Sequence, residues 1–356
     1  MKFTALPSPM MQAGIAGYSD RAMRLVARRR GCPYAMTEAL LDRIMLDGGQ
    51  GLKKSIDIND EDHPVAGQVM GSEPADMAAA AAILADAGYD VIDLNFACPV
   101  KKVKNKARGG WMLKDLPRGT AILRACRDRL GDHPITVSLR RSFDDTPEAQ
   151  DVFWQTLEAA TSVGVAAVRV HGRTVEQKYA GRAKWPAIAE VKRRHPDLFL
   201  FGSGDVFEPS DVVSMLQETG CDAVWVARGA IGNPWIFRDA QKLLAMPADE
   251  DGSYRELLDP PTIEEQRDAL QEHFALSQEI HGEQLAGRRM RKMGIKYSRF
   301  HPEHAQVKKA FIDVSSRRDW QRAIDAWYLS GGPGVWPAAD AADEVNSDPS
   351  LQACDS

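Results

Sequence analysis

Short apolar runs alternate with helical stretches along the first two thirds of the chain, and this alternation limits the fold more than any other feature. The runs are rich in Val, Ile, Leu or Phe and end in small or polar residues, as strands buried on both faces do. The pattern therefore predicts an α/β protein with eight parallel strands. The eight runs are residues 10–15, 34–37, 64–70, 91–95, 135–139, 166–170, 199–201 and 223–226.

Helical stretches between these runs carry recognisable start and stop signals. Proline is favoured in the first turn of a helix, and glycine is favoured just after the last turn. Eight strands with helices between them predict a (β/α)8 TIM barrel over residues 1–245. A doubly wound open sheet has the same alternation and is the alternative fold. The stretches that begin with proline are residues 74–88, 117–130, 147–164 and 209–220.

The composition changes after the last strand candidate. Residues 246–261 are acidic and contain several prolines, which predicts a linker. Residues 262–330 contain helical stretches only, and the first begins with a capping-box spacing between Thr262 and Glu265. We expect a small all-helical domain here. Residues 331–356 are rich in Gly, Pro, Ala and Asp, which predicts a disordered tail.

Composition excludes several classes of protein. No apolar run approaches the roughly 18 residues of a membrane helix, and the N-terminus lacks the layout of a secretory signal. We therefore expect a cytoplasmic protein without a membrane segment. The five cysteines form no CxxC pair, which argues against a disulfide framework and a zinc site. We expect no metal.

Two basic stretches stand out in a chain whose net charge is −5. Residues 99–110 contain five basic residues and no acidic one, and residues 284–309 contain eight basic residues against Glu303 alone. A solvated face is the usual meaning of one such stretch. Two of them on an acidic protein favour a polyanionic partner. Four cations of the second stretch fall on one helical face, namely Arg288, Lys292, Lys296 and Arg299.

Two glycine-rich turns follow the last two strand candidates, at residues 202–205 and 227–229. In a TIM barrel, reactive groups lie at the C-terminal ends of the strands and in the loops that follow. The free backbone N–H groups of such turns bind anions, and Arg228 adds a charged donor. The turns could simply connect elements, but their two positions favour a phosphorylated cofactor.

Cys98 lies in a loop directly after the strand candidate 91–95. An ordinary cysteine thiol, with a pKa of about 8.5, is mostly protonated at neutral pH and can donate a proton. A buried structural cysteine is the alternative. His171 ends another strand candidate and precedes Gly172 and Arg173. This position suggests a contact with an anion or a ring edge, and a structural histidine is the alternative.

Three segments resemble the tRNA-dihydrouridine synthase family: DLNFACPVKKV at residues 93–103, VHGRT at 170–174 and RGAIGNPW at 228–235. The resemblance runs over residues 13–237 and continues weakly through the helical region. It implies an FMN-binding barrel, NADPH as the reductant, and a helical domain that grips tRNA. The implied reaction reduces the uridine C5–C6 double bond, with a hydride to C6 from reduced FMN and a proton to C5 from Cys98.

The resemblance also implies roles for individual residues. Asn95 would hold the uracil edge, and Gln68 and His171 would contact the flavin ring. The target uridine must leave its stack to reach a flavin in a barrel, so base flipping is implied. The implied cofactor contacts are Ala13, Ile15, Gln68, Ser138, Arg169, His171, Gly202, Ser203, Gly204, Asp205, Ala227, Arg228 and Gly229. The implied RNA contacts, besides Asn95, are Lys101, Lys102, Arg173, Arg288, Arg291, Lys292 and Lys296.

The sequence departs from the family pattern at several positions. The opening Ala-Pro-Met-Ala-Gly is Ala-Gly-Ile-Ala-Gly at residues 13–17, the glycine before the cysteine is Ala97, and the asparagine of the first glycine turn is Ser203. The lysine that the family places near the flavin N1–O2 edge corresponds to Ser138. A serine has no charge to stabilise reduced FMN, so this exchange bears on cofactor affinity and on activity.

A compensating charge could come from either of two arginines. Arg169 lies two residues before His171, so both side chains point to the same face of their strand. This strand should neighbour the strand that carries Ser138. Arg140 lies two residues after Ser138 and points to the same face as that serine. Our hypothesis is that Arg169 or Arg140 supplies the missing charge. The alternative is that Arg169 only fills the barrel, paired with an inward acid such as Asp93.

Three functions remain open from the sequence. The first is an enzyme that makes dihydrouridine in tRNA. The second is an RNA-binding flavoprotein relative without activity, acting as a chaperone or scaffold, which Ser138 favours. The third is a flavin oxidoreductase of a small molecule, in which the basic helical region has no evident purpose. The sequence does not fix the modified uridine, tRNA against rRNA, or the oligomeric state, for which a monomer is the working expectation.

Overall fold

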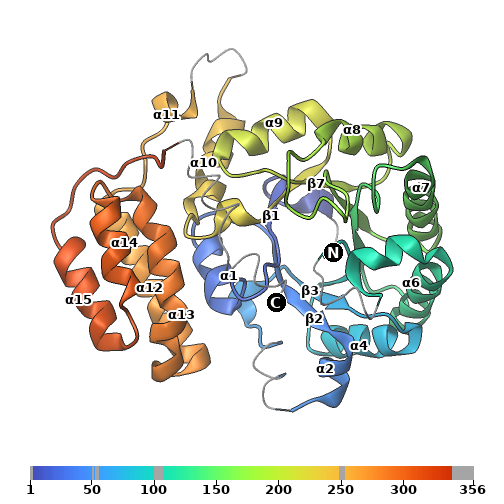
Figure 1. Cartoon of the computed structure of the whole chain (residues 1–356), viewed down its shortest axis with the longest axis horizontal. Helices are drawn as coiled ribbons and strands as arrows, with labels where there is room; N and C mark the ends of the chain where they lie inside the picture. The colour runs from blue at the N-terminus through green and yellow to red at the C-terminus, as the bar shows by residue number, and fades with distance from the viewer. Residues whose placement is uncertain (1–2, 50–51, 53–55, 100–106, 248–252, 339–356) are drawn as a thin grey trace.

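Eight parallel strands close into a barrel in the computed structural model, which describes residues 3–49, 52, 56–99, 107–247 and 253–338 (Figure 1). Each strand pairs in parallel with its neighbours in the chain, and β8 pairs with β1. The closure confirms the predicted TIM barrel and rules out the open sheet. The strands are β1 (Met10–Gln12), β2 (Ala35–Leu41), β3 (Val65–Met70), β4 (Val91–Phe96), β5 (Ile135–Arg140), β6 (Ala167–His171), β7 (Leu200–Ser203) and β8 (Ala223–Val226).

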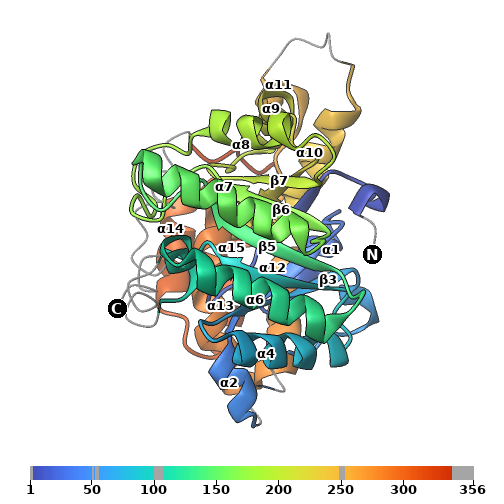
Figure 2. The same ribbon diagram turned by 90° about the vertical axis from the view of Figure 1, so that its right-hand side faces the viewer.

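Helices surround the barrel, and Figure 2 shows α4, α6 and α7 side by side on its outer surface. Proline occupies the first turn of α4, α6, α7 and α9, as their sequences predict. Gly220 ends α9 with a left-handed φ of 66°, a conformation that glycine adopts without strain. The main barrel helices are α1 (Arg21–Arg28), α2 (Asp42–Asp47), α4 (Pro74–Asp86), α6 (Leu116–Leu130), α7 (Pro147–Ser162), α8 (Trp185–Arg194), α9 (Pro209–Thr219) and α10 (Trp235–Ala245).

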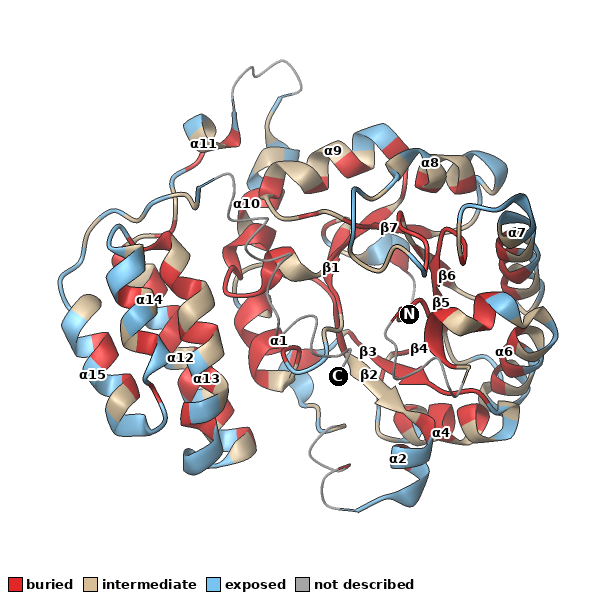
Figure 3. Cartoon of the chain, in the orientation of Figure 1, coloured by how far each residue is buried: buried red, intermediate tan, exposed pale blue. Residues whose placement is uncertain are grey.

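Side chains alternate along each strand between the helices and the barrel interior, and most strand residues are buried (Figure 3). The outward residues are apolar and pack against the helices. The inward residues change in character along the strand. In β4 an apolar Val91 at the closed end is followed inward by Asp93 and Asn95, and in β6 Ala167 is followed by Arg169. Polar inward side chains therefore collect at the C-terminal mouth.

A helical region packs beside α1 and α10 (Figure 1). Its first helix begins at the predicted capping box of Thr262 and Glu265. Glu272 on this helix binds Arg29 and Arg30 of the barrel, at 2.6 and 2.7 Å. No helix in the described ranges is long and apolar enough to cross a membrane. The four helices are α12 (Ile263–His281), α13 (Glu283–Tyr297), α14 (His304–Ile312) and α15 (Arg317–Trp327).

Two segments flank this helical region. The short helix α11 (Tyr254–Leu257) lies within the predicted linker. Residues 331–338 were predicted as part of a disordered tail, and that prediction is wrong for them. The Trp336 ring packs edge-on against Tyr254 with centroids 5.0 Å apart, and its Nε1–H donates to a backbone carbonyl at 3.3 Å. The rest of the predicted tail, residues 339–356, lies outside the described residues.

Candidate active site at the barrel mouth

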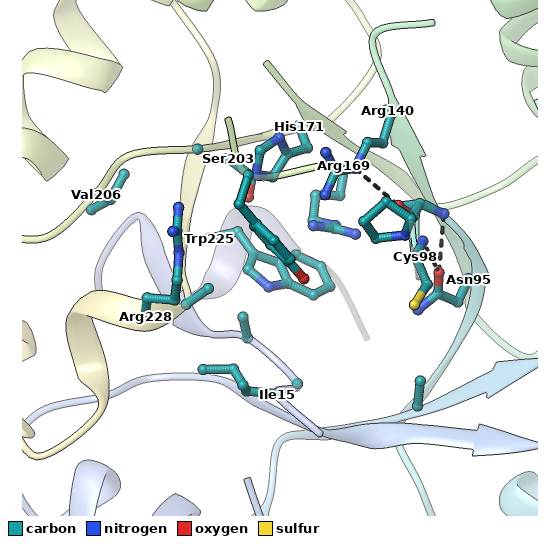
Figure 4. Close-up of a pocket in the computed structure, with 18 of the residues that line it drawn as sticks. Ile15, Asn95, Cys98, Arg140, Arg169, His171, Ser203, Val206, Trp225 and Arg228 are labelled. Carbon is teal, nitrogen blue, oxygen red and sulfur yellow. Dashed lines mark hydrogen bonds between the residues drawn. The ribbon is translucent and has the colours of Figure 1, made fainter. Parts of the chain in front are cut away.

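A cavity of about 1200 Å³, including its open mouth, lies at the C-terminal ends of the strands (Figure 4). Cys98 and Asn95 lie on one side, Arg228 and Val206 lie on the opposite side, and the Trp225 ring lies between them. Cavities of this size and position bind cofactors and substrates in TIM barrels. The site thus has a thiol at one end and a guanidinium at the other.

Asp93 lies beneath the cavity lining and is fully buried. Its carboxylate accepts hydrogen bonds from Gln68 Nε2, Thr136 Oγ1 and Ser138 Oγ, each at 2.7 Å. Burial raises the pKa of Asp93, while the charge of Arg169 and the three donors oppose this rise. All three partners donate, so the carboxylate acts only as an acceptor.

The Asn95 amide connects these side chains to Cys98. Asn95 Nδ2 donates to Gln68 Oε1 at 2.8 Å, and Asn95 Oδ1 accepts the backbone N–H groups of Ala97 and Cys98 at 3.0 and 2.9 Å. The half-buried Cys98 side chain lines the cavity. Asn95 was predicted to hold the uracil edge. Its oxygen is instead occupied by the loop, which leaves one amide N–H for a ligand.

Gly109 and Gly110 pack against Cys98. Gly110 N–H donates to the Cys98 carbonyl at 2.9 Å, and a Cβ on Gly110 would lie 2.7 Å from a Val175 methyl group. Just before them, the buried Arg108 binds the buried Asp42 at 3.1 Å. These contacts fix the described ends of the loop. The predicted RNA contacts Lys101 and Lys102 fall between those ends, outside the described residues.

His171 presents a neutral ring to the cavity. Its Nδ1 accepts the backbone N–H of Arg173 at 3.1 Å, so the ring proton of the neutral form resides on Nε2. Burial lowers the pKa of His171 well below its usual range, and the charges of nearby arginines such as Arg140 and Arg169 add to this effect. His171 therefore offers a hydrogen-bond donor to a ligand without a positive charge.

Asp205 and two arginines form the opposite end of the cavity. Asp205 binds Arg173 at 2.7 Å and Arg228 at 3.4 Å. Arg173 is 1% exposed and also donates to the Gly181 carbonyl, so it is buried beneath the cavity lining instead of lying at the surface for the predicted RNA contact. Its Nη1 is buried and has no hydrogen-bond partner among the described residues. Two guanidinium groups against one carboxylate leave an excess of positive charge.

Backbone N–H groups add to this positive end. Those of Gly204, Asp205 and Val206 have no hydrogen-bond acceptor among the described residues. The two glycine turns lie against each other, because a Cβ on Gly229 would be 2.4 Å from the Val206 carbonyl oxygen. Unpaired N–H groups beside guanidinium groups are typical of a phosphate site. The donor set therefore fits the phosphate of the expected flavin cofactor.

Aromatic side chains complete the cavity, and most of them were not selected from the sequence. Tyr179 lies between Arg140 and Arg228, with its ring centroid 5.6 and 5.2 Å from their guanidinium carbons. Phe207 and Trp225 also line the cavity. Trp225 could have been found from its inward phase on the last strand, two residues before Ala227. These ring surfaces suit a planar aromatic ligand.

Ten of the thirteen predicted cofactor residues line this cavity, together with Cys98 and Asn95. Gly202 does not, because its Cα faces Met215 of α9, where a Cβ would lie 2.8 Å from the sulfur. Ser138 lies beneath the surface and joins Asp93 to Arg169. The predicted residues that line the cavity are Ala13, Ile15, Gln68, Asn95, Cys98, Arg169, His171, Ser203, Gly204, Asp205, Ala227 and Arg228.

The basic residues of α13 lie beside the mouth. Lys292 donates to the Gly17 carbonyl, and its Nζ lies 4.0 Å from the Tyr18 ring centroid. Lys296 packs against Gly232, where a Cβ would lie 2.6 Å from the lysine Cβ. These two lysines therefore join the helical region to the barrel, whereas Arg288 and Arg291 are exposed.

The chain matches a family model described as dihydrouridine synthase (Dus) over residues 11–328. It belongs to the dihydrouridine synthase family. The tRNA-dihydrouridine synthase B of Xanthomonas campestris pv. campestris is 32% identical over 342 residues, which cover 96% of this chain and 98% of that protein. The enzyme of the same name from Pseudomonas aeruginosa is 32% identical over 288 residues, with coverage of 81% and 82%.

Two solved structures share the barrel fold with this dihydrouridine synthase. A 2-naphthoyl-CoA reductase has a TM-score of 0.51 at 11% identity, over 64% of this chain and 47% of that one. The histamine dehydrogenase of Rhizobium sp. 4-9 has a TM-score of 0.50 at 13% identity, over 66% of this chain and 46% of that one. The family match confirms the assignment predicted from the three motifs, and with it the prediction of an oxidoreductase.

Proposed function

We propose that this dihydrouridine synthase reduces the C5–C6 double bond of a uridine in tRNA, with FMN as its cofactor and NADPH as the reductant. The names of its relatives support tRNA as the substrate. The positive end of the cavity, built from Asp205, Arg173, Arg228 and free backbone N–H groups, supports a phosphorylated flavin. Bound FMN would supply the hydride transfer from NADPH to uridine C6.

Cys98 is the proton donor to uridine C5 in this proposal. The observation that carries it is the placement of the thiol in the cavity, opposite the phosphate end (Figure 4). Asp205 is bound by Arg173 and Arg228 and accepts their hydrogen bonds. The guanidinium groups of Arg140 and Arg169 interact electrostatically with Cys98. They stabilise the thiolate that remains after proton transfer.

The tRNA would approach over the mouth and α13. Lys292 places this helix against Gly17, close to the cavity residues Ile15 and Ala16. The exposed Arg288 and Arg291 can then meet phosphates while one uridine is flipped into the cavity.

The direct test is the nucleoside content of tRNA from a strain that lacks this protein. We expect one dihydrouridine site to lose the mass of two hydrogen atoms, and the wild-type chain to restore it. Cys98→Ala should not restore it, whereas Cys126→Ala, which removes a buried thiol on α6, should. Unchanged tRNA in the deletion strain would overturn the proposal, and restoration by Cys98→Ala would overturn the role of the thiol.

A further inference from the structure

Two guanidinium groups line the reactive half of the cavity, and their hydrogen bonds differ. Arg140 is 3% exposed and donates to the carbonyls of Ala97, Thr174 and Lys178 at 3.0, 2.9 and 2.5 Å. Three of its five N–H donors, those of Nε and Nη1, are therefore committed to the walls and to the Cys98 loop. Arg169 makes one side-chain hydrogen bond among the described residues, from Nε. Its terminal nitrogens are left for a ligand.

The Arg169 side chain is nevertheless held firmly. Its guanidinium carbon lies 4.3 Å from the Trp225 ring centroid, so one face is covered by cation–π contact. Its Nε donates to Ser138 Oγ at 3.0 Å, and Ser138 donates in turn to Asp93. Such stacking leaves the N–H groups at the edge of the guanidinium pointing sideways, where a ligand can accept them.

Arg169 is not simply neutralised by the acid below it. No salt bridge within 4.0 Å joins Arg169 and Asp93 in the described ranges, and the Ser138 hydroxyl bonds to both. Burial lowers the pKa of Arg169 to about 10, with Asp93 opposing the shift, so the group stays charged at neutral pH. The direct ion pair with Asp93, which was the alternative drawn from the sequence, is replaced by contact through the Ser138 hydroxyl.

We propose that Arg169 binds the anionic edge of the reduced flavin, and that the Trp225 ring and the Ser138–Asp93 pair hold it in position for this. The inference rests on the proposed function, because it takes FMN as the ligand. A negative charge that forms on reduction of the ring is stabilised by a cation held in place beside it. Ser138 then positions the cation instead of providing one, and Arg140 shapes the Cys98 loop.

Flavin affinity and midpoint potential test this role apart from activity. Arg169→Met should weaken binding of reduced FMN more than binding of oxidised FMN, by roughly tenfold to a hundredfold, as expected for loss of a charged hydrogen bond. Each tenfold difference lowers the two-electron midpoint potential by about 30 mV. Arg169→Lys keeps the positive charge, so its midpoint potential should stay close to that of the wild type.

A rescue variant separates charge from packing. Adding Ser138→Lys to Arg169→Met returns a cation to the same patch and should raise the potential again. A potential that is the same in wild type and Arg169→Met, with both proteins binding FMN, would overturn this inference and leave the proposed function intact. A wild-type protein that binds no FMN in a fluorescence titration would instead overturn the proposed function.

Discussion

Asp93 is a buried carboxylate that organises two reactive groups at once. One of its partners, Gln68, leads through Asn95 to the backbone of Cys98. Another partner, Ser138, leads to Arg169. The proposed proton donor, Cys98, and the cavity cation, Arg169, are thus both positioned through the Asp93 side chain. A network of this kind is strong only while each member is satisfied.

Asp93→Asn should therefore impair both groups together. The new amide would place its N–H hydrogens against side chains that already donate. The free energy of unfolding should therefore fall by about 1–3 kcal/mol. FMN affinity and uridine reduction should both fall, as measured by flavin titration and tRNA mass spectrometry. Asp151→Asn, on the exposed surface of α7, is the matched control. Loss of only one of the two properties in Asp93→Asn would contradict the shared anchor.

His171 should remain neutral across the physiological range, since burial and the surrounding arginines depress its pKa. We expect no inflection from this residue in the pH profile of FMN binding between about pH 5.5 and 8. His171→Asn, which keeps a donor, should give the same flat profile with lower affinity. The idea fails if the wild-type profile shows a histidine titration near neutral pH that His171→Asn removes.

At the scale of elements, α13 divides its cations between two tasks. Lys292 contacts Gly17 and Tyr18 on the barrel, and the exposed Arg288 and Arg291 remain available to RNA. Helical spacing predicted one basic face that runs from Arg288 to Arg299. Part of this face is therefore packed against the barrel. Arg299, for example, donates to the Ile231 carbonyl at 3.0 Å.

Arg288→Glu combined with Arg291→Glu should weaken tRNA binding and leave FMN binding unchanged. The logarithmic dependence of affinity on salt should become shallower by roughly 0.7–0.9 for each lost phosphate contact, as filter binding at several salt concentrations would show. Arg124→Glu with Arg129→Glu on α6, across the barrel from the helical region (Figure 1), is the control. Equal losses in both double variants would mean that general charge, and not α13, governs binding.

Periodicity was enough to locate the strands, because a strand between two layers is apolar on both faces and few other elements are. It also located Gln68, Asn95 and His171, since inward polar residues at strand ends have one cavity to face. Arg173 escaped this reasoning because its long side chain turns back into the wall. Trp225 escaped because an aromatic residue in an apolar strand looks like core until its neighbours are known.

At the scale of the whole molecule, the interface between the barrel and the helical region contains a buried histidine. His273 of α12 is 2% exposed, and burial lowers its pKa to about 4, although Asp20 opposes the shift. The unfolded chain would bind a proton near pH 6.5, so the folded state is disfavoured as pH falls below that value. The contribution of the neutral His273 to the free energy of unfolding is fully present above about pH 6.5 and is lost progressively as the pH falls to about 4.

Thermal unfolding between pH 7 and pH 4 should show this loss, which amounts to about 3 kcal/mol for the shift at His273. His273→Gln cannot titrate and should give a shallower dependence on pH. His304→Gln, at a half-buried histidine of α14, is the comparison variant. Equal pH dependence of unfolding in the wild type and His273→Gln would show that the stability of the protein does not depend on the protonation of His273.

The most direct test mixes the FMN-loaded, NADPH-reduced protein with unmodified tRNA in the absence of oxygen. The flavin should be reoxidised in a single turnover as the tRNA gains the mass of two hydrogen atoms. Cys98→Ala should bind the same tRNA and FMN but react far more slowly, on the order of a hundredfold or more. If the reduced flavin stays reduced with wild-type protein, or if Cys98→Ala reacts at the wild-type rate, the thiol and flavin do not act on one uracil in this cavity.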